Sequence, residues 1–287
     1  MNPDLIVGII GGTGLMGRWF ERFFTSRGYD VLIASRKTEL SIEDCARQSD
    51  VVIISVPIDA AIDVIKKTAP LMKRGGLLMD FTSVKKEPVD AMLKYSQCEV
   101  VGAHPMFGPG VDSLMNQTVI LCPARGSSWL KRIEKIFLQA GAKLKVTTPE
   151  YHDKMMSVIQ GVIHFSSITI SHVLKELDID IAECQEFSSP VYKLRMDMVG
   201  RILNQDGQLY GNIEISNPQT TKALKAYLKT CNRLYNIIDR KDLNEFVKYF
   251  NEAADYLGDF KKEAEEYSNY LIQKLVHKKR KKGEILK

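Results

Sequence analysis

The first half of the chain alternates short apolar runs with amphipathic stretches. The run from Leu5 to Ile10 is uncharged and rich in β-branched residues, which is typical of a strand buried on both faces. Behind it, aromatic residues recur at helical spacing between charged ones: Trp19, Phe20, Phe23 and Phe24. Runs of the same apolar kind predict six more strands, near 30–34, 51–56, 77–81, 99–103, 119–122 and 144–146. Helices are predicted at 58–72, at 86–95 and between the last two strands.

Strands that alternate with helices favour a right-handed parallel sheet with both faces covered. We therefore predict an α/β, doubly wound (Rossmann) N-terminal domain at residues 1–149. From Pro149 onward helical periodicity dominates and no strand is predicted, so we expect an all-helical C-terminal domain at 150–276. Its helices are predicted at 151–177, 188–204, 219–239 and 242–275.

Composition limits the classes of protein that need to be considered. Of 287 residues 45% are hydrophobic and 26% charged, and we see no apolar run of the roughly 20 residues that a membrane span needs. The five cysteines show no C-x-x-C pair, so we expect buried thiols in a reducing cytoplasm, with no metal site. We expect neither a signal peptide nor a membrane partner.

Residues 277–287 form a basic tail that accounts for part of the net charge of +5. A basic run can bind nucleic acid or an anionic membrane. No aromatic residues interleave this one, so we expect a disordered, solvated end and no nucleic-acid partner. The net positive charge also favours a small anionic substrate.

Three glycines follow the first strand at G-x-G-x-x-G spacing: Gly12, Gly14 and Gly17. In a dinucleotide-binding turn the first makes the tight turn, the second lets backbone approach a pyrophosphate, and the third lets the helix pack closely. The spacing alone also fits a plain glycine-rich turn, but the strand before it and the helix after it favour dinucleotide binding. We expect the cofactor to contact the whole loop: Gly12, Thr13, Gly14, Leu15, Met16 and Gly17.

The end of the second predicted strand bears on the choice of cofactor. A NAD enzyme usually has Asp or Glu there to bond the ribose 2′-hydroxyl. Here Ser35, Arg36 and Lys37 follow the strand, and a guanidinium matches the oxygens of a 2′-phosphate. Arg36 also fits a plain surface cation, but we favour NADP over NAD. Val56 and Pro57, at the end of the third strand, are expected to line the same site.

Polar residues cluster where a doubly wound sheet places its active site, beyond the carboxyl ends of the strands. One cluster follows the fourth strand (80–85) and one the fifth (104–110). His104 is the best candidate for a general base, because imidazole titrates near neutral pH and the Gly- and Pro-rich segment reads as a loop. A loop histidine that caps a carbonyl is the alternative. His152 and Asp153 are expected to cap the long helix that they begin or to orient the domain interface. His164 fits a core position as well as a pocket.

These motifs resemble the prephenate dehydrogenases of tyrosine biosynthesis. The likeness begins with Gly-Gly-Thr-Gly-Leu-Met-Gly (11–17) and Thr-Ser-Val-Lys (82–85), and continues with His-Pro-Met-Phe-Gly (104–108). In the second half it lies in four motifs: Glu-Tyr-His-Asp (150–153), Ile-Gln-Gly-Val-Ile-His-Phe-Ser (159–166), Ser-Ser-Pro-Val-Tyr-Lys-Leu (188–194) and Gly-Arg-Ile-Leu-Asn-Gln-Asp-Gly-Gln-Leu-Tyr (200–210). The resemblance therefore spans nearly the whole chain.

The resemblance implies oxidative decarboxylation of prephenate to 4-hydroxyphenylpyruvate, with hydride transfer to a nicotinamide. His104 would be the catalytic base, and Ser83 would bond the same substrate hydroxyl and help to place His104. Arg201 would bind a substrate carboxylate, since guanidinium grips one in a bidentate pair, and His164 would lie near the side-chain end of the substrate. Lys85 is expected to add positive field. Further residues of the substrate pocket would be Lys193, Tyr210 and Gln160.

Alternatives remain open at this point. Arogenate dehydrogenase differs only in the substrate, where an amino group replaces the keto oxygen. A β-hydroxyacid dehydrogenase shares the two-domain layout but usually relies on a lysine base. A nicotinamide-sensing regulator would not need Ser83, His104 and Arg201 together. We expect a homodimer through the helical domain and, with no room for further domains before Asp4 or after Leu275, a single-function enzyme.

Overall fold

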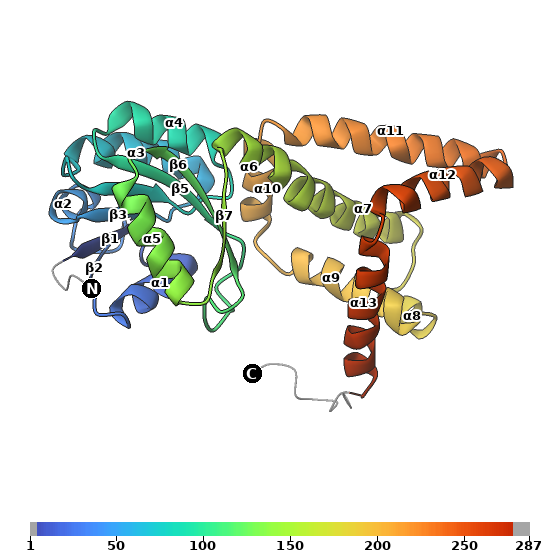
Figure 1. Cartoon of the computed structure of the whole chain (residues 1–287). Helices are drawn as coiled ribbons and strands as arrows, with labels where there is room; N and C mark the ends of the chain where they lie inside the picture. Colours follow the sequence, from blue (N-terminus) through green and yellow to red (C-terminus); the bar gives the residue numbers. More distant parts are fainter. Residues whose placement is uncertain (1–4, 278–287) are drawn as a thin grey trace. The chain divides into compact units, whose positions relative to one another are not determined.

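A seven-stranded sheet forms the core of the N-terminal half in the computed structural model, which describes residues 5–277 (Figure 1). The strand order is β2-β1-β3-β4-β5-β6-β7. The strands are β1 Ile6–Ile10, β2 Asp30–Ala34, β3 Val51–Ile54, β4 Leu77–Asp80, β5 Glu99–Pro105, β6 Thr118–Arg125 and β7 Lys143–Val146. The helices among them are α1 Leu15–Thr25, α2 Ile42–Gln48, α3 Ile58–Thr68, α4 Lys86–Tyr95 and α5 Ser128–Gln139.

Helices cover both faces of this sheet, as the apolar strands require. Every residue of β3 and β4 is buried. On one face, α1 and α5 contribute the aromatic core around Phe20 and Phe137, and on the other α2, α3 and α4 pack around Ile65 and Met92. The doubly wound α/β fold predicted from the strand–helix alternation is confirmed.

The direction of the last two strands differs from the prediction of a wholly parallel sheet. Strands β1 to β5 are parallel, but β6 runs antiparallel to β5, and β7 is parallel to β6. The chain between β5 and β6 carries no helix and turns back directly. A parallel partner would need a longer crossover, usually through a helix.

From Pro149 onward the structure is helical. The helices are α6 Pro149–Met156, α7 Ile163–Glu176, α8 Ile181–Glu186, α9 Pro190–Leu203, α10 Gly207–Ser216, α11 Thr220–Asp239, α12 Leu243–Leu257 and α13 Phe260–His277. A π-helical segment, Ser157–Val162, joins α6 to α7. The single helix expected at 242–275 is divided at Gly258, whose φ of 54° ends α12. The short helices α2, α8 and α10 were not predicted.

The chain divides into two compact units. The first contains the chain up to Gly161 together with Gln208–Thr220, and the second contains Val162–Gly207 and the chain from Thr221 onward. The sheet therefore shares its unit with α6 and α10, whereas the sequence places a boundary between residues 149 and 150. The basic run at 278–282 lies outside the described residues.

The continuous helix Pro149–Glu176 is the one described helix that is long and apolar enough to cross a membrane by length and composition. The expectation that no segment reaches this length is therefore wrong. The same test is passed by helices of proteins that never enter a membrane, and this helix carries His152, Asp153 and Gln160.

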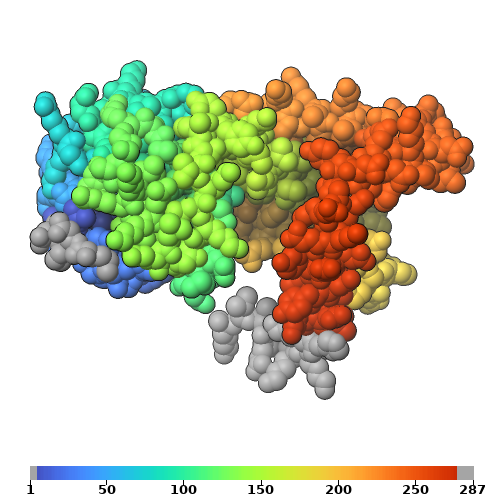
Figure 2. All heavy atoms as spheres, in the orientation of Figure 1, coloured from blue at the N-terminus to red at the C-terminus, as the bar shows by residue number. Residues whose placement is uncertain are grey.

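Helix α12 leaves an apolar face exposed. Leu243, Phe246, Val247 and Phe250 recur at the spacing of one helix face and are 71%, 37%, 48% and 63% exposed. Most of α13 is also exposed along its length, as the red-orange atoms in Figure 2 show. A monomer rarely leaves an apolar face of this kind uncovered.

Candidate active site

The glycine loop between β1 and α1 is shaped by close backbone contacts. Gly11 has a φ of 88°, and a Cβ there would lie 2.2 Å from the carbonyl oxygen of Ser55. Gly11 is therefore the left-handed residue of the turn, while Gly12 is tightly packed, because a Cβ there would lie 2.6 Å from the side chain of Ile33. A Cβ at Gly17 would lie 2.5 Å from the carbonyl oxygen of Gly11, which confirms that this glycine lets α1 pack closely.

The N-terminus of α1 suits an anionic group. Its N-cap, Gly14, is exposed and offers no side-chain cap, and no acidic residue lies in the first turn. The first amides of α1 therefore have no intrahelical partner, and they lie at the positive end of the helix dipole. Leu15 is 75% exposed and Met16 half-buried beside them. The loop after β3 lies against this turn, with Val56 close to Gly11 and Pro57 as the N-cap of α3.

The turn after β2 is held by its own hydroxyl groups. Ser35 accepts a hydrogen bond from the amide of Lys37 (3.0 Å), and Thr38 accepts one from the amide of Ser35 (2.8 Å). Arg36 and Lys37 are exposed. No acidic side chain occurs from Ser35 to Thr38, so this turn presents hydroxyl groups and cations.

His104 lies within strand β5, and the expectation that it belongs to a loop is wrong. It is paired with Ile120 of β6, and its neighbour Pro105 is paired with Val119. Strand β4 pairs with β5 only as far as Gly102. Beyond that point β5 has one neighbour, and proline is tolerated at such an edge-like position. The strand fixes the backbone of His104, whose side chain is only 4% exposed.

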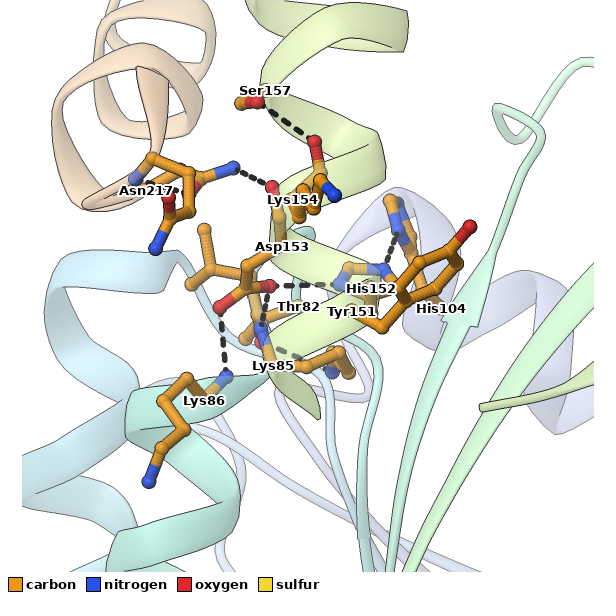
Figure 3. A network of polar contacts seen from close by, with 12 residues as sticks. Thr82, Lys85, Lys86, His104, Tyr151, His152, Asp153, Lys154, Ser157 and Asn217 are labelled. Carbon is orange, nitrogen blue, oxygen red and sulfur yellow. Dashed lines mark hydrogen bonds and ion pairs between the residues drawn. The ribbon is translucent and has the colours of Figure 1, made fainter. Parts of the chain in front are cut away.

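A chain of hydrogen bonds leads from His104 to helix α6 (Figure 3). Nδ1 of His104 lies 2.9 Å from Nε2 of His152, and Nδ1 of His152 lies 2.8 Å from Oδ1 of Asp153. His152 and Asp153 are 1% and 2% exposed. Among residues 5–277, no hydrogen bond to Nε2 of His104 occurs.

Asp153 is anchored at the start of another helix. Its carboxylate accepts hydrogen bonds from the amides of Lys85 (2.8 Å) and Lys86 (2.9 Å), at the N-terminus of α4. Asn217 donates to the backbone carbonyl of Asp153 (2.8 Å). The expectation that Asp153 caps its own long helix is therefore wrong: Asp153 caps α4, whereas Thr148 caps α6.

Lys85 is fully buried. Its ammonium forms an ion pair with Asp80 and donates to the carbonyl of Ala103 (2.9 Å), the residue before His104. Thr82 also donates to the Asp80 carboxylate. The ion pair with Asp80 offsets the field that Lys85 is expected to add to a substrate site, and it braces the end of β4 against β5.

The two buried histidines, His104 and His152, favour their neutral forms. Burial, followed by repulsion from His152 and Lys85, holds the pKa of His104 well below the ordinary 6.5. Burial also lowers the pKa of His152, although its hydrogen bond to Asp153 acts in the opposite direction. Both effects follow from the cost of placing a cation in an apolar interior. His104 is therefore available as a proton acceptor at neutral pH.

The remaining predicted site residues fall in both units. Ser83 is half-buried in the loop between β4 and α4, and among the described residues it forms no hydrogen bond with His104, whose ring is held by His152. Gln160 lies in the π-helical segment, and its Oε1 is a buried acceptor with no partner within residues 5–277. Such segments are often found at functional sites. Tyr210 lies half-buried on α10.

The second unit holds the other three predicted substrate-binding residues. His164 lies on α7, and Lys193 and Arg201 lie on α9, which contacts α7. Arg201 is exposed, whereas His164 and Lys193 are half-buried. The second unit thus places two cations and a histidine on neighbouring helices.

Sequence reasoning did not assign His152 and Asp153 to the site. His152 lies 48 residues beyond His104 and Asp153 follows it, and only the contacts of α6 with α4 and β6 bring them to it. The one available signal was the His-Asp pair within the motif at 150–153. No local pattern predicts that its partner lies on a strand.

Both halves of the chain match family models. Residues 23–146 match the nucleotide-binding domain of prephenate dehydrogenase, and residues 148–252 match the dimerization domain of prephenate dehydrogenase.

Relatives and solved structures agree with this match. The probable arogenate/prephenate dehydrogenase of Methanocaldococcus jannaschii is 36% identical to this chain. The matched region covers 94% of this chain and 65% of the length of that protein. The T-protein of Haemophilus influenzae is 32% identical over 95% of this chain and 73% of its own length. The crystal structure of prephenate dehydrogenase from A. aeolicus with hydroxyphenyl propionate and NAD+ superposes with a TM-score of 0.72. It covers 89% of this chain and 98% of that one at 21% identity, a likeness of fold alone.

The buried histidines predict a loss of stability in acid. Their pKa values are lowered in the folded state, so below about pH 6.5 the unfolded chain binds more protons and the free energy of unfolding falls. Each histidine contributes a slope of up to about 1.4 kcal/mol per pH unit between its unfolded and folded pKa values. Trp19 and Trp129, the only tryptophans, are both buried in the first unit, so urea unfolding followed by their fluorescence measures this unit.

In the variant His104→Asn the free energy of unfolding should fall less steeply as the pH decreases below about 6.5, because asparagine does not titrate. Equal slopes for the two proteins would contradict a neutral, buried His104.

Proposed function

The chain belongs to the prephenate dehydrogenase family, and on this premise we propose that it converts prephenate to 4-hydroxyphenylpyruvate by oxidative decarboxylation. The observation that carries the proposal is the state of His104. Its backbone is fixed by strand β5 and its ring by His152, burial lowers its pKa, and Nε2 has no hydrogen-bond partner among residues 5–277.

His104 acts as the general base in this proposal. It accepts the proton of the ring hydroxyl at Nε2 while the ring carbon is oxidised, and proton acceptance by a positioned base contributes about 10²–10⁴-fold to the rate. Loss of carbon dioxide then makes the ring aromatic, which drives the reaction forward. Ser83 donates a hydrogen bond to the same hydroxyl oxygen.

The substrate carries two carboxylates, and the proposed binding residues match that charge. Arg201 grips one carboxylate through two parallel hydrogen bonds, a geometry that guanidinium favours. Lys193 adds a second cation. His164 lies near the side-chain end of the substrate, with Tyr210 and Gln160 as further polar partners.

The residues around the glycine loop fit a nicotinamide dinucleotide. The uncapped amides of α1 would hold its pyrophosphate, and Thr13, Leu15, Met16, Val56 and Pro57 would line its path. When bound, the nicotinamide supplies the hydride acceptor for the reaction. We propose NADP as the preferred form, because Ser35 and Arg36 match a 2′-phosphate and no carboxylate in that turn opposes it.

Arogenate is a second candidate substrate. The Methanocaldococcus relative carries both substrates in its name. The two molecules differ only at the side-chain end, near which His164 and Gln160 are proposed to lie. Prephenate is preferred here because the half-buried imidazole of His164 can donate to its keto oxygen.

We propose that the protein is a homodimer through its helical unit. The exposed apolar face of α12 offers a surface that a second copy would cover, and residues 148–252 match a domain described as a dimerization domain.

The variant His104→Asn tests the role of the base. Its kcat with prephenate should fall by about 10²–10⁴-fold, the usual contribution of a general base, while KM changes little. Steady-state assays with prephenate and with arogenate, each at saturating NADP, measure both quantities.

The control is His172→Asn, which removes an exposed histidine from α7 and should leave kcat unchanged. A kcat for His104→Asn equal to that of the parent would contradict the assignment. Equal or better turnover of arogenate by the parent would replace prephenate as the substrate.

The variant Arg36→Ala tests the cofactor preference. A hydrogen bond to a charged group contributes about 1.5–3 kcal/mol. Because Arg36 is exposed, we expect the lower end, about a 10-fold fall in kcat/KM for NADP, with little change for NAD. Arg74→Ala removes the same charge just before the amino end of β4, whereas Arg36 follows the carboxyl end of β2, so this control should affect neither cofactor. A parallel fall for both cofactors would contradict a 2′-phosphate contact.

A further inference from the structure

The hydrogen-bond chain behind His104 has a direction. The carboxylate of Asp153 accepts amide hydrogens from Lys85 and Lys86 at the positive end of the α4 dipole. An ionised carboxylate only accepts hydrogen bonds. The contact of 2.8 Å between Oδ1 of Asp153 and Nδ1 of His152 therefore requires the hydrogen to lie on that nitrogen.

The direction of the hydrogen bond at Asp153 also fixes the next one, between His152 and His104. A neutral imidazole carries one hydrogen, so with Nδ1 protonated, Nε2 of His152 is an acceptor. The contact of 2.9 Å between Nε2 of His152 and Nδ1 of His104 then requires the hydrogen on Nδ1 of His104. Nε2 of His104, which has no partner among the described residues, is left with its lone pair.

We propose that His152 and Asp153 are positioning residues that hold His104 in the one tautomer able to accept the substrate proton. The proposal rests on His104 being the base of the proposed reaction. If His152 carried its hydrogen on Nε2, the lone pair of its Nδ1 would face a lone pair of the Asp153 carboxylate. His104 would then accept at Nδ1 and carry its hydrogen on Nε2, which could not act as a base.

The arrangement also stabilises the positive charge that forms on His104 during the reaction. Once Nε2 of His104 accepts a proton, the imidazolium donates from Nδ1 into a chain that ends in a carboxylate. In serine proteases a carboxylate bonded directly to the histidine plays this part, and the variant that reverses the tautomer loses about 10⁴-fold in kcat. Here a second imidazole lies between the base and the carboxylate.

Two amide variants of His152 form a matched pair. In His152→Gln the side-chain amide reaches about as far as Nε2 of the histidine did. The Asp153 carboxylate attracts the NH2 group of this amide, so the amide oxygen is left to accept a hydrogen bond from Nδ1 of His104. In His152→Asn the amide is one methylene shorter and stays beside Asp153, so His104 loses its acceptor. The variants have the same chemistry and differ in whether His104 is held.

We expect kcat to fall by about 10²–10³-fold in His152→Asn and to stay within about 10-fold of the parent in His152→Gln, with KM nearly unchanged in both. A merely structural role would lower the unfolding midpoint and kcat together, and the tryptophan fluorescence of the first unit measures that midpoint. Retention of near-parental kcat by His152→Asn would overturn the proposal, as would an equal loss in both variants.

Nitrogen-15 NMR of the histidine rings tests the tautomer without any substrate. Chemical shifts assigned with His104→Asn should show hydrogen on Nδ1 of His104 in the parent and in His152→Gln. Hydrogen on Nε2 in the parent would overturn the proposal even if the protein proves to be a prephenate dehydrogenase. If the parent turns over neither substrate but shows hydrogen on Nδ1, the proposed function fails and the tautomer assignment stands.

Discussion

The contact between the Asp153 carboxylate and the first amides of α4 is the interaction on which the site depends. It fixes the start of α6 against α4 and at the same time sets the hydrogen-bond direction that reaches His104 through His152. A buried carboxylate is costly unless its oxygens are satisfied. Here two backbone amides and an imidazole satisfy them, so the packing of two helices and the chemistry of a base share one group.

A second buried group, the ion pair of Lys85 and Asp80, supports strand β5, which carries His104. The Lys85 ammonium, neutralised by Asp80, donates to the carbonyl of Ala103 and so ties the end of β4 to β5 just before His104. Removing one partner of such a pair leaves an uncompensated buried charge. The backbone of His104 is thus braced by an ion pair, while its ring is oriented by an imidazole.

Much of the fold could be predicted from the sequence, because uninterrupted apolar runs such as that of β3 occur in sheets covered on both faces. Strand β2 and helix α4 lie where they were predicted. The reversal at β6 could not be predicted, since an antiparallel and a parallel strand buried on both faces share one pattern. The same reversal explains the error at His104: its pairing with β6 extends β5 through a proline that reads as the start of a loop.

The candidate site was predictable only where its chemistry is local. The glycine loop has a sequence signature, to which the structure adds the left-handed residue Gly11. His104 was found because it stands at the end of an apolar run. His152 was not, because its role comes from a contact 48 residues away that no spacing encodes.

The most direct test of the account is a crystal structure of the enzyme with a nicotinamide cofactor and 4-hydroxyphenylpyruvate. We predict the phenolic oxygen within about 2.6–3.2 Å of Nε2 of His104, the reach of a general base, with Nδ1 still bonded to His152. A phenolic oxygen bound out of reach of His104, with another side chain in that position, would contradict the account.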